Sequence, residues 1–156
     1  MNKKPIILGI ESSCDETAAS IITENEQGMP TILSSIVSSQ VDVHKEFGGV
    51  VPELAARSHM EKIDLITKKA FDESGVKMEE LDAIAATAGP GLMVCLSVGL
   101  SFGKAMASSL NKPLPPTSDN RLSWTWSPLV AISLISTSSI PKSFACLRIF
   151  SLAFSA

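Results

Sequence analysis

The sequence predicts an α/β domain, and three observations support this prediction. Three short apolar runs follow one another near the N-terminus, at residues 6–10, 18–23 and 30–38. A long segment, residues 51–74, repeats its apolar positions at helical spacing. A short apolar run, a glycine-rich break and a second long apolar segment then follow between residues 81 and 110. Strands and helices in this order indicate a sheet with helices packed against it.

The first three runs are predicted to form an antiparallel meander. They read IILGI, AASIIT and PTILSSIVS, and short polar segments separate them. The first two are joined by Ser-Ser-Cys-Asp-Glu-Thr, residues 12–17, which contains no glycine, proline or asparagine. A hairpin that only had to reverse direction would use such turn residues. We therefore expect a second role for this turn.

Residues 51–74 predict a helix with one apolar face. Pro52 lies in its first turn and Gly75 just beyond its end, which is typical of helix boundaries. The apolar face comprises Ala55, His59, Ile63, Ile66 and Ala70. A charged ladder on another face comprises Glu53, Arg57 and Glu61. We interpret His59 as buried or at an interface, and we expect His44 at the surface.

Residues 81–87 predict a short buried strand, and residues 92–110 a second helix. Small residues fall every four positions along this helix, at Cys95, Gly99, Gly103 and Ala107. They permit close approach to a sheet or to another helix. The segment nears the length of a membrane span, and the same spacing serves dimers of membrane helices. Lys104 and four serines count against a span, so we expect burial in a soluble core.

Composition limits the classes of function. The 156 residues suffice for one modest domain, and a formal net charge of −3 gives no basic surface for binding nucleic acid without help. Three widely spaced cysteines argue against a disulfide framework and a zinc site, and favour a reducing cytoplasm. The apolar run that follows Lys3 and Lys4 is too short for the core of a signal peptide.

Residues 114–156 differ in composition from the rest of the chain. Of 13 basic and 16 acidic residues, only Asp119, Arg121, Lys142 and Arg148 lie beyond residue 116. The segment shows neither helical periodicity nor clean alternation. A membrane signal or an interaction tail is an alternative, but prolines and Arg148 interrupt every apolar run before spanning length. We interpret residues 114–156 as an atypical tail, frameshifted or non-native, and residues 1–113 as the folded lobe.

Two segments contain candidate site residues. The turn at residues 12–17 presents hydroxyls that can contact phosphate and carboxylates that can hold hydrated Mg²⁺. Its alternative is a solvated turn whose side chains satisfy local backbone groups. In Thr-Ala-Gly-Pro-Gly-Leu, residues 87–92, the glycines permit close backbone approach and the following helix N-terminus favours an anion. Its alternative is a turn that only packs tightly. Cys14 has no identifiable base partner, which disfavours a nucleophile.

Three motifs together resemble a known family. GIESSCDET, FGGVVPELAARSH and TAGPGL, in this order and spacing, are similar to the N-terminal lobe of the catalytic subunit of tRNA threonylcarbamoyladenosine synthases. The resemblance runs from Ile6 to Pro113. It implies an actin-like/sugar-kinase (ribonuclease H-like) fold with a mixed sheet and two related lobes, whose chemistry lies in the cleft between them. It also implies a cytoplasmic enzyme that transfers threonylcarbamoyl from an adenylate to the tRNA adenosine beside the anticodon.

The resemblance also assigns roles to individual residues. It implies that Ser13, Asp15 and Glu16 are catalytic positions near the cleft, and that Gly89 and Gly91 belong to the turn that binds the adenylate or ATP. The helix from Pro52 would contribute to pairing with a non-catalytic paralogous subunit. An associated ATPase would join the complex, which would also bind the tRNA, and no membrane would be involved.

The sequence departs from the family pattern after the second helix. Family members use a metal ion, iron or zinc, and carry an H-x-x-x-H pair after the helix that ends near Leu110. This chain has no histidine there. We therefore expect no metal site in it and no transfer activity from the chain alone. Two alternatives stay open: a kinase or ATPase of the same superfamily, and a non-catalytic module that binds the partner subunit.

Overall fold

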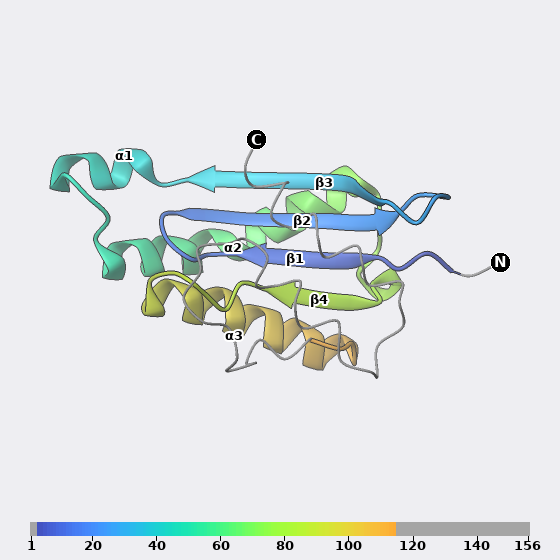
Figure 1. Cartoon of the computed structure of the whole chain (residues 1–156). Helices are drawn as coiled ribbons and strands as arrows, with labels where there is room; N and C mark the ends of the chain where they lie inside the picture. Colours follow the sequence, from blue (N-terminus) through green and yellow to red (C-terminus); the bar gives the residue numbers. More distant parts are fainter. Residues whose placement is uncertain (1–2, 115–156) are drawn as a thin grey trace.

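The computed structural model describes residues 3–114 (Figure 1). One four-stranded sheet has the order β3-β2-β1-β4, with strands β1 (Ile7–Glu11), β2 (Glu16–Glu24), β3 (Pro30–Ser39) and β4 (Ala83–Ala86). The helices are α1 (Val41–His44), α2 (Pro52–Ser74) and α3 (Met93–Leu110), with short 3₁₀ helices η1 (Lys45–Phe47) and η2 (Met78–Glu80).

The first three strands form the predicted meander. β1 pairs antiparallel with β2, and β2 pairs antiparallel with β3. α2 then carries the chain across the sheet to β4, which runs parallel to β1. The sheet is therefore mixed, as expected. Because β1 and β4 are parallel neighbours, their carboxyl ends meet at the same end of the sheet.

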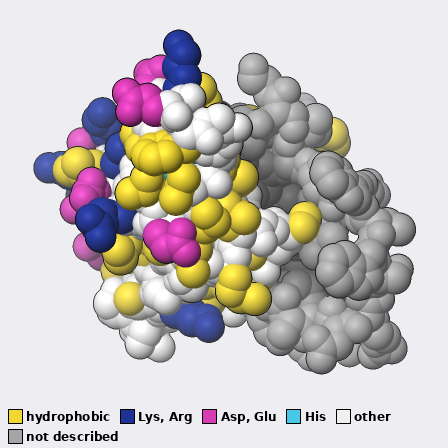
Figure 2. Space-filling model, turned by 90° about the vertical axis from the view of Figure 1, so that its left-hand side faces the viewer, with side chains coloured by type: hydrophobic (Ala, Val, Ile, Leu, Met, Phe, Trp, Pro, Cys, Tyr) yellow, Lys and Arg dark blue, Asp and Glu magenta, His cyan; other side chains and the backbone are white. Residues whose placement is uncertain are grey.

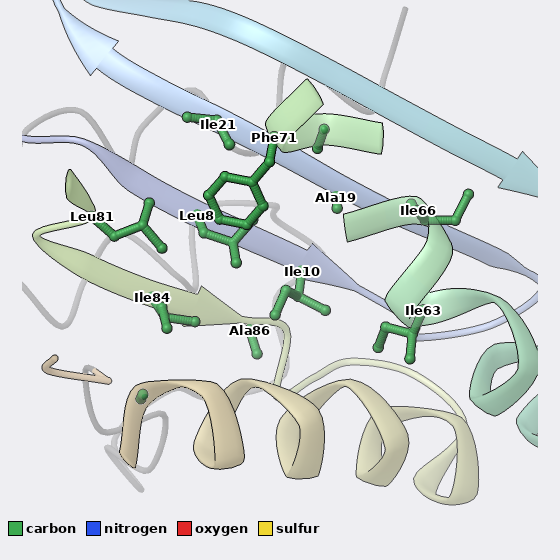
Figure 3. Close-up of a cluster of buried hydrophobic side chains, with 12 residues drawn as sticks. Leu8, Ile10, Ala19, Ile21, Ile63, Ile66, Phe71, Leu81, Ile84 and Ala86 are labelled. Carbon is green, nitrogen blue, oxygen red and sulfur yellow. The ribbon is translucent and has the colours of Figure 1, made fainter. Parts of the chain in front are cut away.

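Helices α2 and α3 cover one face of the sheet (Figure 1). α2 packs against β2 and β3, whereas α3 packs against β4 and β1. Between them and the sheet lies the main hydrophobic core (Figure 3), which includes Leu8, Ile10, Ala19, Ile21, Ile63, Ile66, Phe71, Leu81, Ile84 and Ala86. The predicted apolar face of α2 is buried along its length, and the charged ladder is exposed. Gly75 ends the helix in the left-handed conformation with φ 70°.

The small residues of α3 are buried against the sheet, as predicted. A Cβ atom on Gly103 would lie 3.2 Å from the Cβ of Ala86, so larger residues here would push α3 away from β4. By length and composition α3 could cross a membrane, and 28% of it is buried, but core helices of soluble proteins meet the same criteria. Within residues 3–114, no other helix meets them.

The prediction for His44 is wrong. The side chain is only 4% exposed, and its Nδ1 accepts a hydrogen bond from the backbone N–H of Val51 at 3.4 Å. The physical reason is a reversal at Gly48, whose φ of 67° returns the chain toward the α1 helix.

The expected boundary at residue 113 falls at the end of the described residues. The Leu114 side chain still packs against the main core. The rest of the predicted tail, with Cys146, lies outside the described residues.

Candidate active site

Two turns lie side by side where β1 and β4 end. One is the β1–β2 turn, residues 12–15, and the other is the segment 87–92 between β4 and α3. The backbone N–H of Thr87 donates to the carbonyl of Ile10 at 3.0 Å, and the N–H of Leu92 donates to the carbonyl of Ser13 at 2.7 Å. The structure therefore brings the two motifs that carry candidate site residues into direct contact.

The two glycines of the second turn have different functions in the structure. A Cβ atom on Gly91 would lie 2.6 Å from the carbonyl oxygen of Ser13 and 2.7 Å from its Cβ. Only glycine therefore allows this approach without moving the first turn. Gly89 has open space around it, but its φ is 150°, a conformation that other residues rarely adopt. It precedes a cis peptide bond to Pro90.

Ser12 connects the β1–β2 turn to α3. Its side chain is buried, and its hydroxyl donates to the carbonyl of Cys95 at 2.8 Å and accepts from the N–H of Gly99 at 3.0 Å. This carbonyl and this N–H are the pair that a regular α-helix joins directly. The Ser12 hydroxyl thus bonds both the donor and the acceptor of one i to i+4 pair of the α3 backbone. A side chain on Gly99 would collide with it.

Three consecutive carbonyl groups of the turn are held by three different parts of the fold. The carbonyl of Ser13 accepts from Leu92, just before α3. The carbonyl of Cys14 accepts from Nε2 of His59, in α2, at 3.1 Å. The carbonyl of Asp15 accepts from the backbone N–H of Gln40, just before α1, at 3.0 Å. The backbone of the turn is therefore fixed from several sides.

The predicted catalytic residues lie on this fixed backbone. Ser13 and Asp15 are half-buried within the turn, and Glu16 is exposed at the first position of β2.

Hydrophobic side chains gather on the end of the molecule where α1 and the first turns of α2 and α3 lie, among acidic and basic side chains (Figure 2). Exposed apolar residues at this end include Val41 and Val43 in α1, Phe47 in η1 and Met93 in α3.

Glu11 is a site residue that the sequence analysis missed. It is the last residue of β1, and its carboxylate accepts hydrogen bonds from the N–H of Ser13 at 2.5 Å and from the hydroxyl of Thr87. It therefore links the two turns. The available signal was an acidic residue directly after the predicted strand 6–10, within the motif GIESSCDET, to which no role was assigned.

Burial shifts the pKa of three side chains near the turn. It raises the pKa of the Cys14 thiol above its ordinary value, and the hydrogen bond to Asp15 and the charge of Asp15 raise it further. Burial also raises the pKa of the Cys95 thiol, which donates to the carbonyl of Pro52 at 3.7 Å. Burial lowers the pKa of His59. A protonated Cys14 thiol is a poor nucleophile, so these shifts disfavour a nucleophilic role for Cys14.

A family model places the chain among known proteins. The model for TsaD, tRNA N6-adenosine threonylcarbamoyltransferase, matches residues 31–119. The chain belongs to this family. The tRNA N6-adenosine threonylcarbamoyltransferase of Pelagibacter ubique (strain HTCC1062) is 98% identical over 113 residues, which cover 72% of this chain and 32% of that protein. The protein of the same name from Chelativorans sp. (strain BNC1) is 54% identical over 110 residues, which cover 70% and 30%.

The chain thus spans about a third of the length of these curated threonylcarbamoyltransferases. Among solved structures, YeaZ from Pseudomonas aeruginosa is similar with a TM-score of 0.52 and 17% sequence identity. That match covers 70% of this chain and 41% of the YeaZ chain. At this identity the similarity concerns the fold alone, and it confirms the predicted α/β class.

Residues 3–114 do not fit the metal ion that the family resemblance implies. Within residues 3–114, no three His, Cys, Asp or Glu side chains come together in a group that could hold a metal. Both ring nitrogens of His59 are engaged in hydrogen bonds, and Nδ1 of His44 accepts from Val51. We therefore assign no metal-dependent step to these residues.

Proposed function

We propose that this chain forms one wall of the active site of a tRNA N6-adenosine threonylcarbamoyltransferase. In the proposed reaction, the exocyclic amine of the adenosine beside the anticodon attacks the carbonyl carbon of threonylcarbamoyl adenylate. A carbon–nitrogen bond forms, the bond from that carbon to the phosphate oxygen breaks, and AMP leaves while the amine loses a proton. The contact between the two turns is the observation that supports this proposal most strongly.

The carboxylates of the β1–β2 turn are the proposed catalytic groups. A carboxylate placed at the attacking amine can accept its proton. The Asp15 side chain interacts with the Cys14 thiol, whereas Glu16 is exposed beside it. We therefore assign the proton transfer to Glu16 and polar contacts with the substrate to Ser13 and Asp15.

The segment around Gly89 and Gly91 is the proposed binding site for the adenylate phosphate. Leu92 caps α3 without a side-chain hydrogen bond, and the first turn of α3 contains no acidic residue. The backbone N–H groups of that first turn can therefore bind an anion, and the helix dipole adds to the attraction.

We propose that the chain on its own binds the adenylate but does not transfer the threonylcarbamoyl group. Transfer requires the carbonyl carbon of the adenylate and the tRNA amine to be held within reacting distance by groups that converge from both sides of a cleft. Residues 3–114 supply the two turns of one side. The second side is expected from the part of the family that this chain does not match.

The outer surface of α2 and α3 is the proposed site for the paralogous subunit of a modification complex with an associated ATPase. A pocket beside these helices is lined by the apolar side chains of Met78, Phe102, Met106 and Leu110 and by the polar or charged side chains of Asp64, Thr67, Lys68 and Ser109. Leu65 of α2 is 57% exposed. Exposed apolar groups that gather on one surface are typical of protein interaction sites. A tRNA would then be bound by the complex, in agreement with the net charge of −3.

Ligand titration followed by NMR tests the proposed site. A non-reactive analogue of threonylcarbamoyl adenylate is added to the ¹⁵N-labelled chain. We expect the largest changes in chemical shift at the amides of Ser13, Asp15 and Gly91. The amide of Gly28, in the exposed turn between β2 and β3 away from the site, is the internal control. Shifts that concentrate elsewhere, or none at millimolar analogue, would reject the proposed site.

A further inference from the structure

His59 is fully buried in α2, and both of its ring nitrogens make hydrogen bonds. Nε2 lies 3.1 Å from the carbonyl oxygen of Cys14. Nδ1 lies 2.8 Å from the hydroxyl of Thr17 and 3.2 Å from the side-chain nitrogen of Gln40. All three neighbours lie outside α2, so the ring connects that helix to the β1–β2 turn and to the start of α1.

These contacts define the tautomer of the ring. A carbonyl oxygen can only accept a hydrogen bond, so Nε2 must carry the proton. Nδ1 is then free to accept from the hydroxyl of Thr17 and from the amide of Gln40. The side-chain oxygen of Gln40 is buried and has no hydrogen-bond partner within residues 3–114.

The hydrogen bond from His59 is unlike the other two that hold the turn. The carbonyls of Ser13 and Asp15 accept from backbone N–H groups, which almost any residue at positions 92 and 40 would supply. Only the Cys14 carbonyl accepts from a side chain. The peptide group between Cys14 and Asp15 is planar, so the direction of this carbonyl also sets the direction in which the Asp15 backbone continues.

We propose that His59 is a positioning residue, whose hydrogen bond to the Cys14 carbonyl fixes the direction in which Asp15 and Glu16 leave the turn. The catalytic use of these carboxylates rests on the proposed function, whereas the positioning does not. An apolar side chain would complete the buried face of α2 as well as His59 does. A buried imidazole is costly unless its polar atoms are paired, and here both nitrogens are paired across elements.

Two substitutions separate the hydrogen bond from the space that the ring fills. His59→Gln can place an amide donor near the position of Nε2. His59→Asn is shorter, so it can replace Nδ1 but cannot reach the Cys14 carbonyl. Ile63→Ala is the matched control, because Ile63 belongs to the hydrophobic core and its truncation removes buried volume one turn further along the same face of α2.

The Cys14 thiol reports the geometry of the turn without any substrate. It is exposed, whereas Cys95 is buried, and Cys146 is replaced by serine in every variant. Partial burial and the Asp15 side chain raise the pKa of Cys14, so a turn that moves out of these surroundings should lower that pKa and speed alkylation of the thiol. We expect His59→Asn to accelerate alkylation about tenfold, and His59→Gln and Ile63→Ala to stay within about twofold of the parent.

Two results would overturn the positioning role. One is an alkylation rate in His59→Asn equal to that of the parent. The other is an equal acceleration in Ile63→Ala, which would mean that any loss of helix packing loosens the turn. Titration with the adenylate analogue then separates the two proposals. If the parent chain fails to bind the analogue while His59→Asn still changes Cys14 reactivity, the positioning holds and the proposed function fails.

Discussion

The backbone N–H of Leu92 donates a 2.7 Å hydrogen bond to the carbonyl oxygen of Ser13. The two residues belong to motifs far apart in the sequence, and each motif alone is compatible with a simple structural turn. The bond forms because Gly91 has no side chain to hold the two segments apart. The candidate site is therefore a property of two turns in contact.

Gly91→Ala should destabilise the chain. Its new Cβ would lie within 2.7 Å of two atoms of Ser13, so the turns must separate. We expect the free energy of unfolding in urea to fall by about 1–3 kcal/mol, as for other overpacked sites. Gly49→Ala is the control, because Gly49 has open space around it and no positive φ, and it should change stability by less than about 0.5 kcal/mol. Equal effects of the two substitutions would contradict the proposed contact.

Ser12→Ala should loosen the attachment of the turn to α3. The buried hydroxyl bonds both the Cys95 carbonyl and the Gly99 N–H, which can pair with each other once it is removed. We therefore expect a moderate loss of about 1 kcal/mol in thermal or urea unfolding. Ser97→Ala is the control: its exposed hydroxyl bonds only the Val94 carbonyl of its own helix, and a stability loss as large as that of Ser12→Ala would refute this interpretation.

Asp15→Asn should make Cys14 more reactive. The hydrogen bond to Asp15 and its negative charge both raise the pKa of the thiol. Their removal lowers that pKa, so more thiolate is present at a given pH and alkylation accelerates. The pH dependence of the alkylation rate, in a Cys146→Ser background, gives the thiol pKa directly. Asp42→Asn, at an exposed acid of α1, should leave this pKa unchanged. A Cys14 pKa that is the same in Asp15→Asn and in the parent would contradict the interaction between Asp15 and the thiol.

Stability should decrease as the pH falls, with a contribution from His59. Its pKa is lowered in the folded chain from the ordinary value of 6.5, so the unfolded state binds the proton more readily. The contribution is fully present above pH 6.5 and is lost as the pH drops below 6.5 toward the folded pKa. Carboxylates also titrate at low pH, so the His59→Gln variant serves as reference. A difference between parent and variant that does not change with pH would contradict the neutral, buried ring.

The regular elements could be predicted because their signals are local. The apolar face of α2, with Pro52 and Gly75 at its ends, gives a helix from Pro52 to Ser74. The small residues every four positions in α3 identify its buried face. The links within the site could not be predicted in the same way. Glu11 reaches Thr87 and His59 reaches Cys14 only after α2 has crossed the sheet, and the burial of His44 depends on a reversal at Gly48.

Binding of the paralogous subunit should depend on the outer surface of α2 and α3. Leu65→Asp replaces an exposed apolar side chain of α2 by a charge and should abolish co-purification. Met29→Asp is the matched control, because Met29 is 59% exposed and Leu65 57%, and Met29 lies in the turn between β2 and β3. Loss of binding in both variants, or in neither, would indicate a different interface.

The central claim is that this chain supplies one wall of a transferase site and needs a second wall for chemistry. The most direct measurement incubates the purified chain with the partner proteins, threonylcarbamoyl adenylate and unmodified tRNA, and quantifies modified adenosine by mass spectrometry. We predict that the chain joins the paralogous subunit while the product stays at the level of a control without the chain. Modified adenosine clearly above that control would contradict the account.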